Sequence, residues 1–110
     1  MHIAHYLHEA DLSEAFKSYV ERRLRFALGR YGNRVGDVAV RVGVEGPTLS
    51  RCRISVELLP FGRVAVDETG TDLFGAVDRA TGRVGRLFGR ELERIHDTRT
   101  SRESVRKRAA

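Results

Sequence analysis

The sequence predicts an α+β domain with the element order β-α-β-β-β-α. Three features support this order: a helix-start signal near the N-terminus, three central segments in which every second residue is apolar, and a long amphipathic segment at the C-terminal end. The chain has 110 residues, 41% of them apolar, which suffices for a single hydrophobic core. We expect a four-stranded mixed sheet with both helices packed on one of its faces.

The first two elements are a short strand and a helix. Residues 2–7 form a weak strand candidate. Asp11, followed three residues later by Glu14, predicts the helix start. Apolar side chains at helical spacing define one buried face: Phe16, Val20, Leu24, Ala27 and Tyr31. Gly29 and the Gly32-Asn33 pair are expected to end this helix.

Three strands follow, with alternating apolar and polar residues. Side chains predicted to point inward are those of Val38, Val40, Val42, Val44, Cys52, Ile54, Val56, Leu58, Val64 and Val66. Gly46-Pro47 and residues 60–62 form the turns between these strands. Strands one and two should be parallel because a helix connects them, and the short turns make the other pairs antiparallel. One face of the sheet is then apolar and covered, and the other is polar and solvated.

The second helix should begin near Thr71 or Asp72 and end near Ile95. Its core side carries Phe74, Val77, Val84, Leu87, Phe88, Leu92 and Ile95. Five arginines fall within roughly 80° of one another on the opposite side: Arg79, Arg83, Arg86, Arg90 and Arg94. This arginine stripe, about 20 Å long, suits the phosphates of a nucleic acid, because only Asp72 and Glu93 lie on or beside it. An ordinary solvated helix face is the alternative.

The first helix adds a smaller basic set. Arg22 and Arg25 should project toward solvent, with Arg23 at the edge of the buried face. Tyr19 and Phe26 flank the same outer side. They are candidates for stacking on nucleic acid bases, and packing at the sheet margin is the alternative.

Glycines interrupt the second helix at positions where each costs up to about 1 kcal/mol relative to alanine. Gly75, Gly82, Gly85 and Gly89 fall on one flank of the arginine stripe, away from the predicted core. One hypothesis is that this flank lets the helix backbone approach RNA closely. Codon bias at tolerant solvent positions is the alternative.

The charge points to a polyanionic partner. The chain carries a net charge of +5, with an isoelectric point near 10.1, and its 20 basic residues are 18 arginines plus Lys17 and Lys107. A GC-rich genome would enrich arginine in the same way. The sequence contains neither a membrane-spanning apolar run nor the pattern of a secretion signal, and a cytoplasmic location is the expectation.

Enzymatic and metal-binding functions are not predicted. His2, His5 and His8 cannot converge on one ion from a strand, because the middle residue points to the opposite face. Cys52 is expected to be a buried, inert thiol. No nucleophile and base can be placed together and no phosphate-binding loop is present, so we expect no cofactor, metal or small-molecule substrate.

The last segment differs from the rest of the chain. Residues 96–110 lack apolar periodicity, and five basic residues against two acids give them a net charge of +3. We therefore expect a folded domain over residues 1–95 and a basic tail over 96–110 that is disordered in isolation.

Several short strings, taken in order, resemble one protein family. Residues 72–80, Asp-Leu-Phe-Gly-Ala-Val-Asp-Arg-Ala, are similar to its D-x-Y-x-A-I-D-x-A helix start, and residues 18–24 are similar to its Y-V-x-x-K-L helix. Gly46-Pro47 with residues 51–53 resembles a loop and strand of one branch. The chain thus resembles the ribosome hibernation promoting factor and ribosome-associated inhibitor family, also called sigma-54 modulation proteins, over about residues 1–95.

This resemblance implies a domain akin to double-stranded RNA-binding domains. It also implies binding to 16S rRNA in the decoding-side channel of the small ribosomal subunit, where mRNA and tRNA would lie, so that translation stops in stationary or stressed cells. The positions that match the family's rRNA contacts are Arg22, Arg23, Arg25, Arg79, Arg83, Arg86 and Arg90. A short form of this kind is expected to bind one ribosome as a monomer.

The chain departs from the family pattern at three places. Phe74 replaces a tyrosine, Phe26 replaces a residue that is basic in many relatives, and the loop over 45–49 is reduced. Two other functions remain open. One is a general binder of structured RNA away from the ribosome. The other is a protein-interaction module that uses the solvated sheet face or an edge strand.

Overall fold

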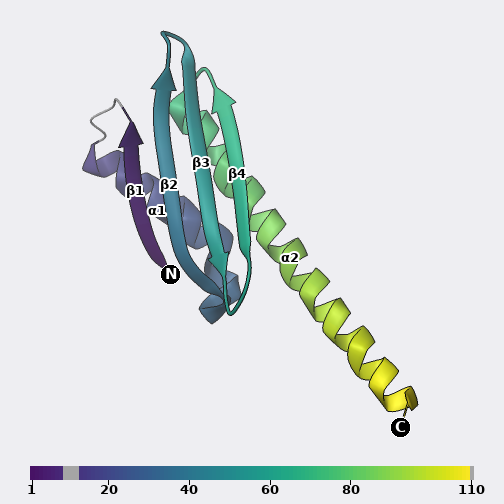
Figure 1. The fold of residues 1–110 in the computed structure, drawn as a ribbon. Helices are drawn as coiled ribbons and strands as arrows, with labels where there is room; N and C mark the ends of the chain where they lie inside the picture. The colour runs from purple at the N-terminus through teal and green to yellow at the C-terminus, as the bar shows by residue number, and fades with distance from the viewer. Residues whose placement is uncertain (9–12, 110) are drawn as a thin grey trace.

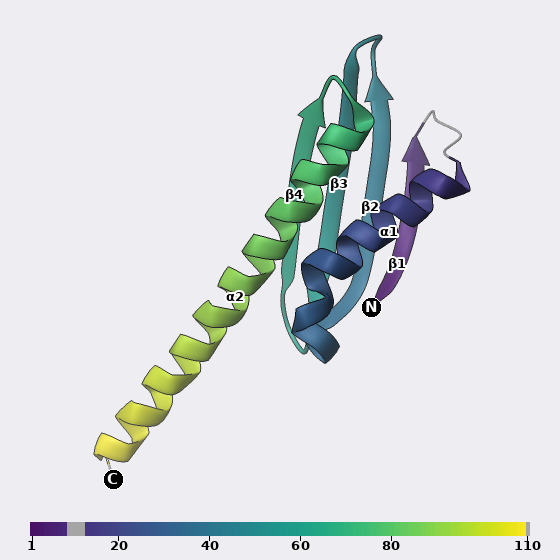
Figure 2. The same ribbon diagram turned by 180° about the vertical axis from the view of Figure 1, so that it is seen from behind.

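The computed structural model confirms the predicted α+β fold. It describes residues 1–8 and 13–109, with the side chains of residues 7, 8, 45 and 97–109 left out. The elements are β1 (His2–His8), α1 (Glu14–Leu28), the 3-10 helix η1 (Gly29–Arg34), β2 (Val35–Glu45), β3 (Leu49–Leu58), β4 (Arg63–Gly70) and α2 (Leu73–Ala109). Both helices lie on the same face of the sheet (Figures 1 and 2).

The sheet has the strand order β1-β2-β3-β4. β1 and β2 are parallel and the other pairs antiparallel, as predicted. The inward side chains of β2 and β3 pair across the sheet, for example Val40 with Ile54 and Val42 with Cys52, and all four are buried. Val44 was also expected to point into the core, but it is 39% exposed. The β2–β3 hairpin extends past both helices, so neither helix covers its tip (Figure 2).

Helix α1 begins later than the sequence signal indicated. Ser13 is its N-cap, and the Ser13 hydroxyl accepts a hydrogen bond of 3.1 Å from the Phe16 amide. The predicted signal at Asp11 lies outside the described residues. The helix ends at Leu28, which is fully buried although the predicted face omitted it. Ala27 and Tyr31 are only partly buried.

The chain turns from α1 into the sheet through η1. Gly32 has φ +55°, a left-handed conformation that favours glycine. At the end of η1, Arg34 Nε donates to the Leu59 carbonyl at 2.8 Å, and the Leu59 amide donates back to the Arg34 carbonyl at 2.8 Å. This pair of hydrogen bonds fastens the β3–β4 turn to the end of η1.

Helix α2 begins where predicted. The Asp72 carboxylate accepts hydrogen bonds of 3.3 Å from the amides of Phe74 and Gly75 and so satisfies the first turn. Val77, Val84 and Phe88 are buried as predicted. The core also takes in Ala76, Ala80 and Thr81, whereas Phe74 is 47% exposed. Its ring packs at the edge of the core, 5.2 Å from the rings of both Phe16 and Tyr19.

The end of α2 predicted near Ile95 is wrong, because the helix continues to Ala109 and projects beyond the sheet (Figure 1). Residues 90–109 contain neither glycine nor proline and are rich in arginine and glutamate, so no local signal stops the helix. The division of the isolated protein at residue 95 into a folded domain and a disordered tail stays a prediction.

Candidate nucleic-acid interface

Two glycines of α2 lie close against α1 and η1. Gly85 is buried, and a Cβ atom there would lie 3.0 Å from the Ala27 carbonyl oxygen of α1. A Cβ atom at Gly89 would lie 2.5 Å from the Tyr31 hydroxyl oxygen. The prediction that the helix glycines share a flank away from the core is therefore wrong for Gly85 and Gly89, which make room for α1 and η1. At Gly82, an added Cβ would meet only Arg86 Nη1, at 3.6 Å.

A groove follows this contact between the helices. Its first part has a volume of about 400 Å³ and is lined by Arg23, Phe26, Ala27, Arg30, Thr81, Gly82, Gly85 and Arg86. An adjoining hollow of about 430 Å³ is lined by Arg30, Tyr31, Arg86, Gly89, Arg90, Leu92 and Glu93. The two share Arg30 and Arg86, and together they are called the interhelix groove below. It collects arginines from α1, η1 and α2.

The electrostatics of the interhelix groove favour an anion. Its lining includes four arginines and only one carboxylate, that of Glu93. Among the side chains that the structure describes, no carboxylate forms an ion pair with Arg30, Arg86 or Arg90, and all three are exposed. Arg30 instead lies over the Tyr31 ring, 5.1 Å from its centroid. These three guanidinium groups can therefore bind phosphate without first giving up a carboxylate.

Arg23 lines the groove and is held by an ion pair with Asp78 of α2. Its buried Nε lies 3.4 Å from Asp78 Oδ1 and makes no hydrogen bond within the described residues. The Tyr19 hydroxyl donates to the same carboxylate, and this hydrogen bond, with burial, raises the pKa of Tyr19. The Tyr19–Asp78–Arg23 cluster thus joins α1 to α2. Of the two roles considered for Tyr19, its contacts fit packing.

The five arginines of the predicted stripe differ in their contacts. Arg79 and Arg83 turn toward β4, where Arg83 Nη1 lies 3.0 Å from Glu68 Oε1, and Arg79 Nη2 donates to the Thr69 carbonyl at 2.7 Å. Arg94 is paired with Glu91, and that carboxylate raises the pKa of Arg94. Arg86 and Arg90 alone among the five line the interhelix groove. A helical wheel of α2 cannot show a carboxylate from another element, such as Glu68 of β4.

The other predicted residues lie on α1 or close to it. Arg22 and Arg25 are exposed but do not line the groove, whereas Arg23 does. The sequence interpretation missed Arg30 because it follows Gly29, the expected helix end. Its spacing of seven residues from Arg23, two helical turns, was the available signal. Phe26 is 86% exposed at the rim of the groove.

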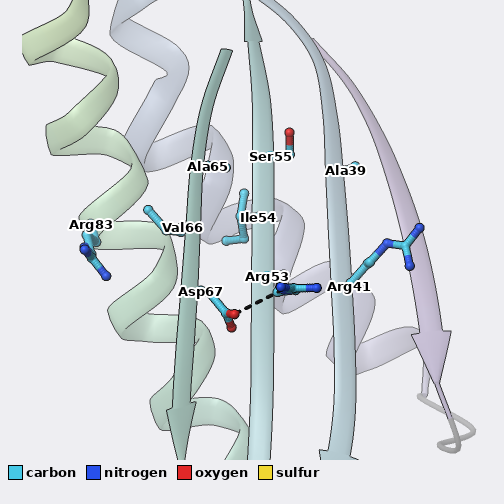
Figure 3. A pocket seen from close by; sticks show the side chains of 9 residues that line it. All are labelled: Ala39, Arg41, Arg53, Ile54, Ser55, Ala65, Val66, Asp67 and Arg83. Carbon is cyan, nitrogen blue, oxygen red and sulfur yellow. Dashed lines mark hydrogen bonds and ion pairs between the residues drawn. The ribbon is translucent and has the colours of Figure 1, made fainter.

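A second hollow lies on the solvated face of the sheet (Figure 3). The small residues Ala39, Ser55 and Ala65 are in register across three strands and leave a depression of about 490 Å³. Asp67 lies in this depression. Its Oδ1 accepts a hydrogen bond of 2.9 Å from Arg51 Nε, and its Oδ2 accepts one of 3.1 Å from Arg53 Nε. The hydrogen bond from Arg51, and to a smaller extent the one from Arg53, lowers the pKa of Asp67. Because Arg53 is paired with Asp67 and Arg83 with Glu68, the sheet hollow is less suited to a polyanion than the interhelix groove.

Other chemistry has little support in the described part of the chain. Cys52 is fully buried, and burial raises the pKa of its thiol to about 12, so it is a poor nucleophile near neutral pH. His5 Nε2 lies 3.1 Å from Glu21 Oε1. In the described part of the chain, which does not include the side chain of His8, no three potential metal ligands gather at one point. Nor does any helix there combine the length and apolarity needed to cross a bilayer.

Comparison with known proteins identifies the family. Residues 3–96 match the sigma 54 modulation protein / S30EA ribosomal protein family. The chain belongs to this family. The resemblance noted from residues 72–80 and 18–24 is thereby confirmed. The comparison with curated protein sequences gave no significant match.

Two solved structures share the fold of this family member. The N-terminal domain of Protein Y from Thermus thermophilus is 30% identical, with a TM-score of 0.72 over 82% of this chain and 98% of that domain. A ribosomal subunit interface protein from Coxiella burnetii is 16% identical, with a TM-score of 0.74 over 84% of this chain and 99% of that one. These likenesses support the four-stranded sheet with two helices as the fold of the family.

Proposed function

We propose that this family member is a ribosome-associated translation inhibitor of the hibernation type. In this proposal its interhelix groove binds 16S rRNA in the decoding-side mRNA and tRNA channel of the small ribosomal subunit. The observation that carries the proposal is the groove itself, in which Arg23, Arg30, Arg86 and Arg90 converge from three elements. The ribosomal names of the family and of the Coxiella burnetii protein support rRNA as the polyanion.

The proposed mechanism is occupancy. A protein held in this channel through phosphate contacts excludes mRNA and tRNA from the same space, and no bond is made or broken. The planar guanidinium of arginine can contact two phosphate oxygens at once, which fixes orientation as well as charge. We propose that the protein acts in the cytoplasm and binds one ribosome as a monomer.

The arginines are not expected to contribute equally. Arg30, Arg86 and Arg90 form no ion pair within the described side chains, and Arg22 and Arg25 extend the basic surface along α1. Arg79 and Arg83 must exchange Glu68 for a phosphate, and Arg94 must exchange Glu91. Losing a carboxylate partner offsets part of the free energy gained by binding a phosphate. We therefore place the arginines without an ion pair at the centre of the interface and the three paired arginines at its margin.

Sedimentation of cell lysate through sucrose gradients tests this function. At low salt the protein should travel with small subunits and 70S particles, and at higher salt it should dissociate because phosphate contacts release counterions. The variant Arg30→Ala plus Arg86→Ala should stay at the top. Arg41→Ala plus Arg63→Ala removes the same charge from the opposite face of the sheet and should sediment like the wild type.

The outcomes separate the alternatives. Wild-type protein that stays at the top at low salt contradicts the ribosomal proposal. If that protein still binds structured RNA in solution, it acts away from the ribosome. Sedimentation that is insensitive to salt, or is lost with the Arg41 and Arg63 variant instead, favours a protein-interaction module on the sheet face.

A further inference from the structure

Phe26 is an exposed aromatic residue at the edge of the interhelix groove. Its side chain is 86% exposed although its neighbours Leu24 and Leu28 on α1 are fully buried. Burying a phenylalanine side chain ordinarily stabilises a protein by about 1.5–3 kcal/mol, a gain that is forgone here. The fold therefore does not use Phe26 for its own packing.

Charged neighbours surround this ring. Arg23 lies three residues before Phe26, a spacing that brings side chains to the same side of α1. Arg30, in η1, lines the same hollow as Phe26. Arg86 lines the same hollow from α2. The rim thus combines one flat apolar ring with three guanidinium groups. Base faces and phosphates are the two parts of an unpaired nucleotide that such groups bind.

We propose that Phe26 is a stacking platform for an unpaired base, so that the interhelix groove binds a single-stranded or extrahelical nucleotide. This proposal rests on the proposed function and deepens it by naming the RNA structure that the groove takes. The base lies on the Phe26 ring, and Arg23, Arg30 and Arg86 contact the flanking phosphates. Recognition is tolerant of sequence, because every base presents a face that can stack.

A double-stranded segment would not use Phe26 in this way. The base faces of a duplex are covered by their neighbours, and mainly phosphates and sugars remain for contact. Aromatic residues and arginine are also enriched at protein interfaces, so the experiment below includes an outcome for a protein partner. The combination of one aromatic ring and a basic groove is typical of proteins that bind single strands.

Binding of two short RNA probes tests the proposal. One probe is a single strand that contains 2-aminopurine, and the other is a fully paired hairpin with the same number of phosphates. Phe26→Ala should weaken single-strand binding about 5- to 150-fold, the range that corresponds to stacking of one base, with hairpin binding unchanged. Phe26→Tyr should restore the affinity and the quenching of 2-aminopurine fluorescence.

A matched control is available in the β3–β4 turn. Phe61 is also 86% exposed but does not line the groove, so Phe61→Ala should leave binding of both probes unchanged. Both phenylalanines are on the surface, and circular dichroism checks that the variants fold.

The outcomes distinguish the two levels of the proposal. Arg30→Ala plus Arg86→Ala should weaken binding of both probes; if neither the wild type nor this variant binds RNA or ribosomes, the proposed function fails. If this variant weakens both probes while Phe26→Ala weakens neither, or weakens both equally, stacking is wrong and the basic groove stands. Loss of ribosome binding by Phe26→Ala with unchanged binding of both probes also overturns stacking, in favour of a protein contact.

Discussion

The Tyr31 hydroxyl donates a hydrogen bond of 3.2 Å to the Gly85 carbonyl oxygen and so joins η1 to the N-terminal half of α2. The Tyr31 ring also packs against Phe88, with ring centroids 5.1 Å apart. Arg30 precedes Tyr31 and Arg86 follows Gly85, and both line the interhelix groove. The contact that holds η1 against α2 therefore also brings together the segments that carry Arg30 and Arg86, two of the arginines on which the proposed function depends.

Two glycines of α2 should respond oppositely to alanine. Gly85→Ala places a Cβ atom 3.0 Å from the Ala27 carbonyl oxygen, so we expect a loss of about 1–2 kcal/mol in the free energy of unfolding. Gly82→Ala meets only the end of the flexible Arg86 side chain and should gain up to about 1 kcal/mol from helix propensity. Urea denaturation measures both. Equal effects of the two substitutions would show that the helices do not approach at Gly85.

Single arginine substitutions should change the salt dependence of RNA binding unequally. Arg86→Ala removes a cation that forms no ion pair within the described side chains. It should reduce the magnitude of the negative slope of log Kobs against log salt by about 0.7–0.9. Arg79→Ala should lower it less, because Arg79 already donates to the Thr69 carbonyl and lies near Glu68. Titrations at several salt concentrations give the slopes. Identical slopes for the two variants would mean that pairing within the protein does not determine how much each arginine contributes to RNA binding.

The Asp67 cluster should contribute to stability at neutral pH. Arg51 and Arg53 lower the pKa of Asp67 below its ordinary value of 3.8. A carboxyl group with a lowered pKa stabilises the fold above the ordinary pKa, and this contribution is lost as the pH falls through the folded-state value. Asp67 is partly exposed, so the contribution should stay below about 1 kcal/mol.

Asp67→Asn tests this assignment. Between about pH 6 and pH 3, the wild type should lose more unfolding free energy than the variant, because only the wild type has this carboxylate to protonate. Urea denaturation at the two pH values gives the difference. A variant that loses as much as the wild type would show that the ion pairs of Asp67 do not stabilise the fold.

Cys52 should report on global unfolding. The thiol is fully buried and its pKa is raised to about 12, so the native protein should react very slowly with Ellman's reagent at pH 8. Urea should raise the rate in parallel with loss of the circular dichroism signal. Rapid reaction of the native protein would place the thiol outside the core.

The fold was predictable because its signals are local. Alternation in residues 37–45 and in the next strand marks the inward face directly, and the helix between β1 and β2 requires their parallel pairing. The errors lie at positions where neighbouring elements determine whether a side chain is buried. Val44 fits the alternation but lies at a hairpin tip that neither helix covers.

The site was only partly predictable, because it is made by contacts between elements. The wheel of α2 grouped five arginines correctly along one helix, but Glu68 comes from β4 and pairs with Arg83. The wheel places Gly85 on a solvent-facing flank, but in the structure α1 packs against it. Arg30 gains its role only because η1 continues from α1 toward α2. The seven-residue spacing from Arg23 could have pointed to Arg30, but the local pattern carries no signal for the contacts of Glu68 and of α1 with α2.

Chemical footprinting of 16S rRNA on purified small subunits tests the central claim most directly. With wild-type protein, and with Arg41→Ala plus Arg63→Ala, bases that line the mRNA and tRNA channel should be protected from dimethyl sulfate. With Arg30→Ala plus Arg86→Ala this protection should disappear at the same protein concentration. Protection outside the channel, or protection that survives in the groove variant and is lost in the sheet-face variant, would contradict the account.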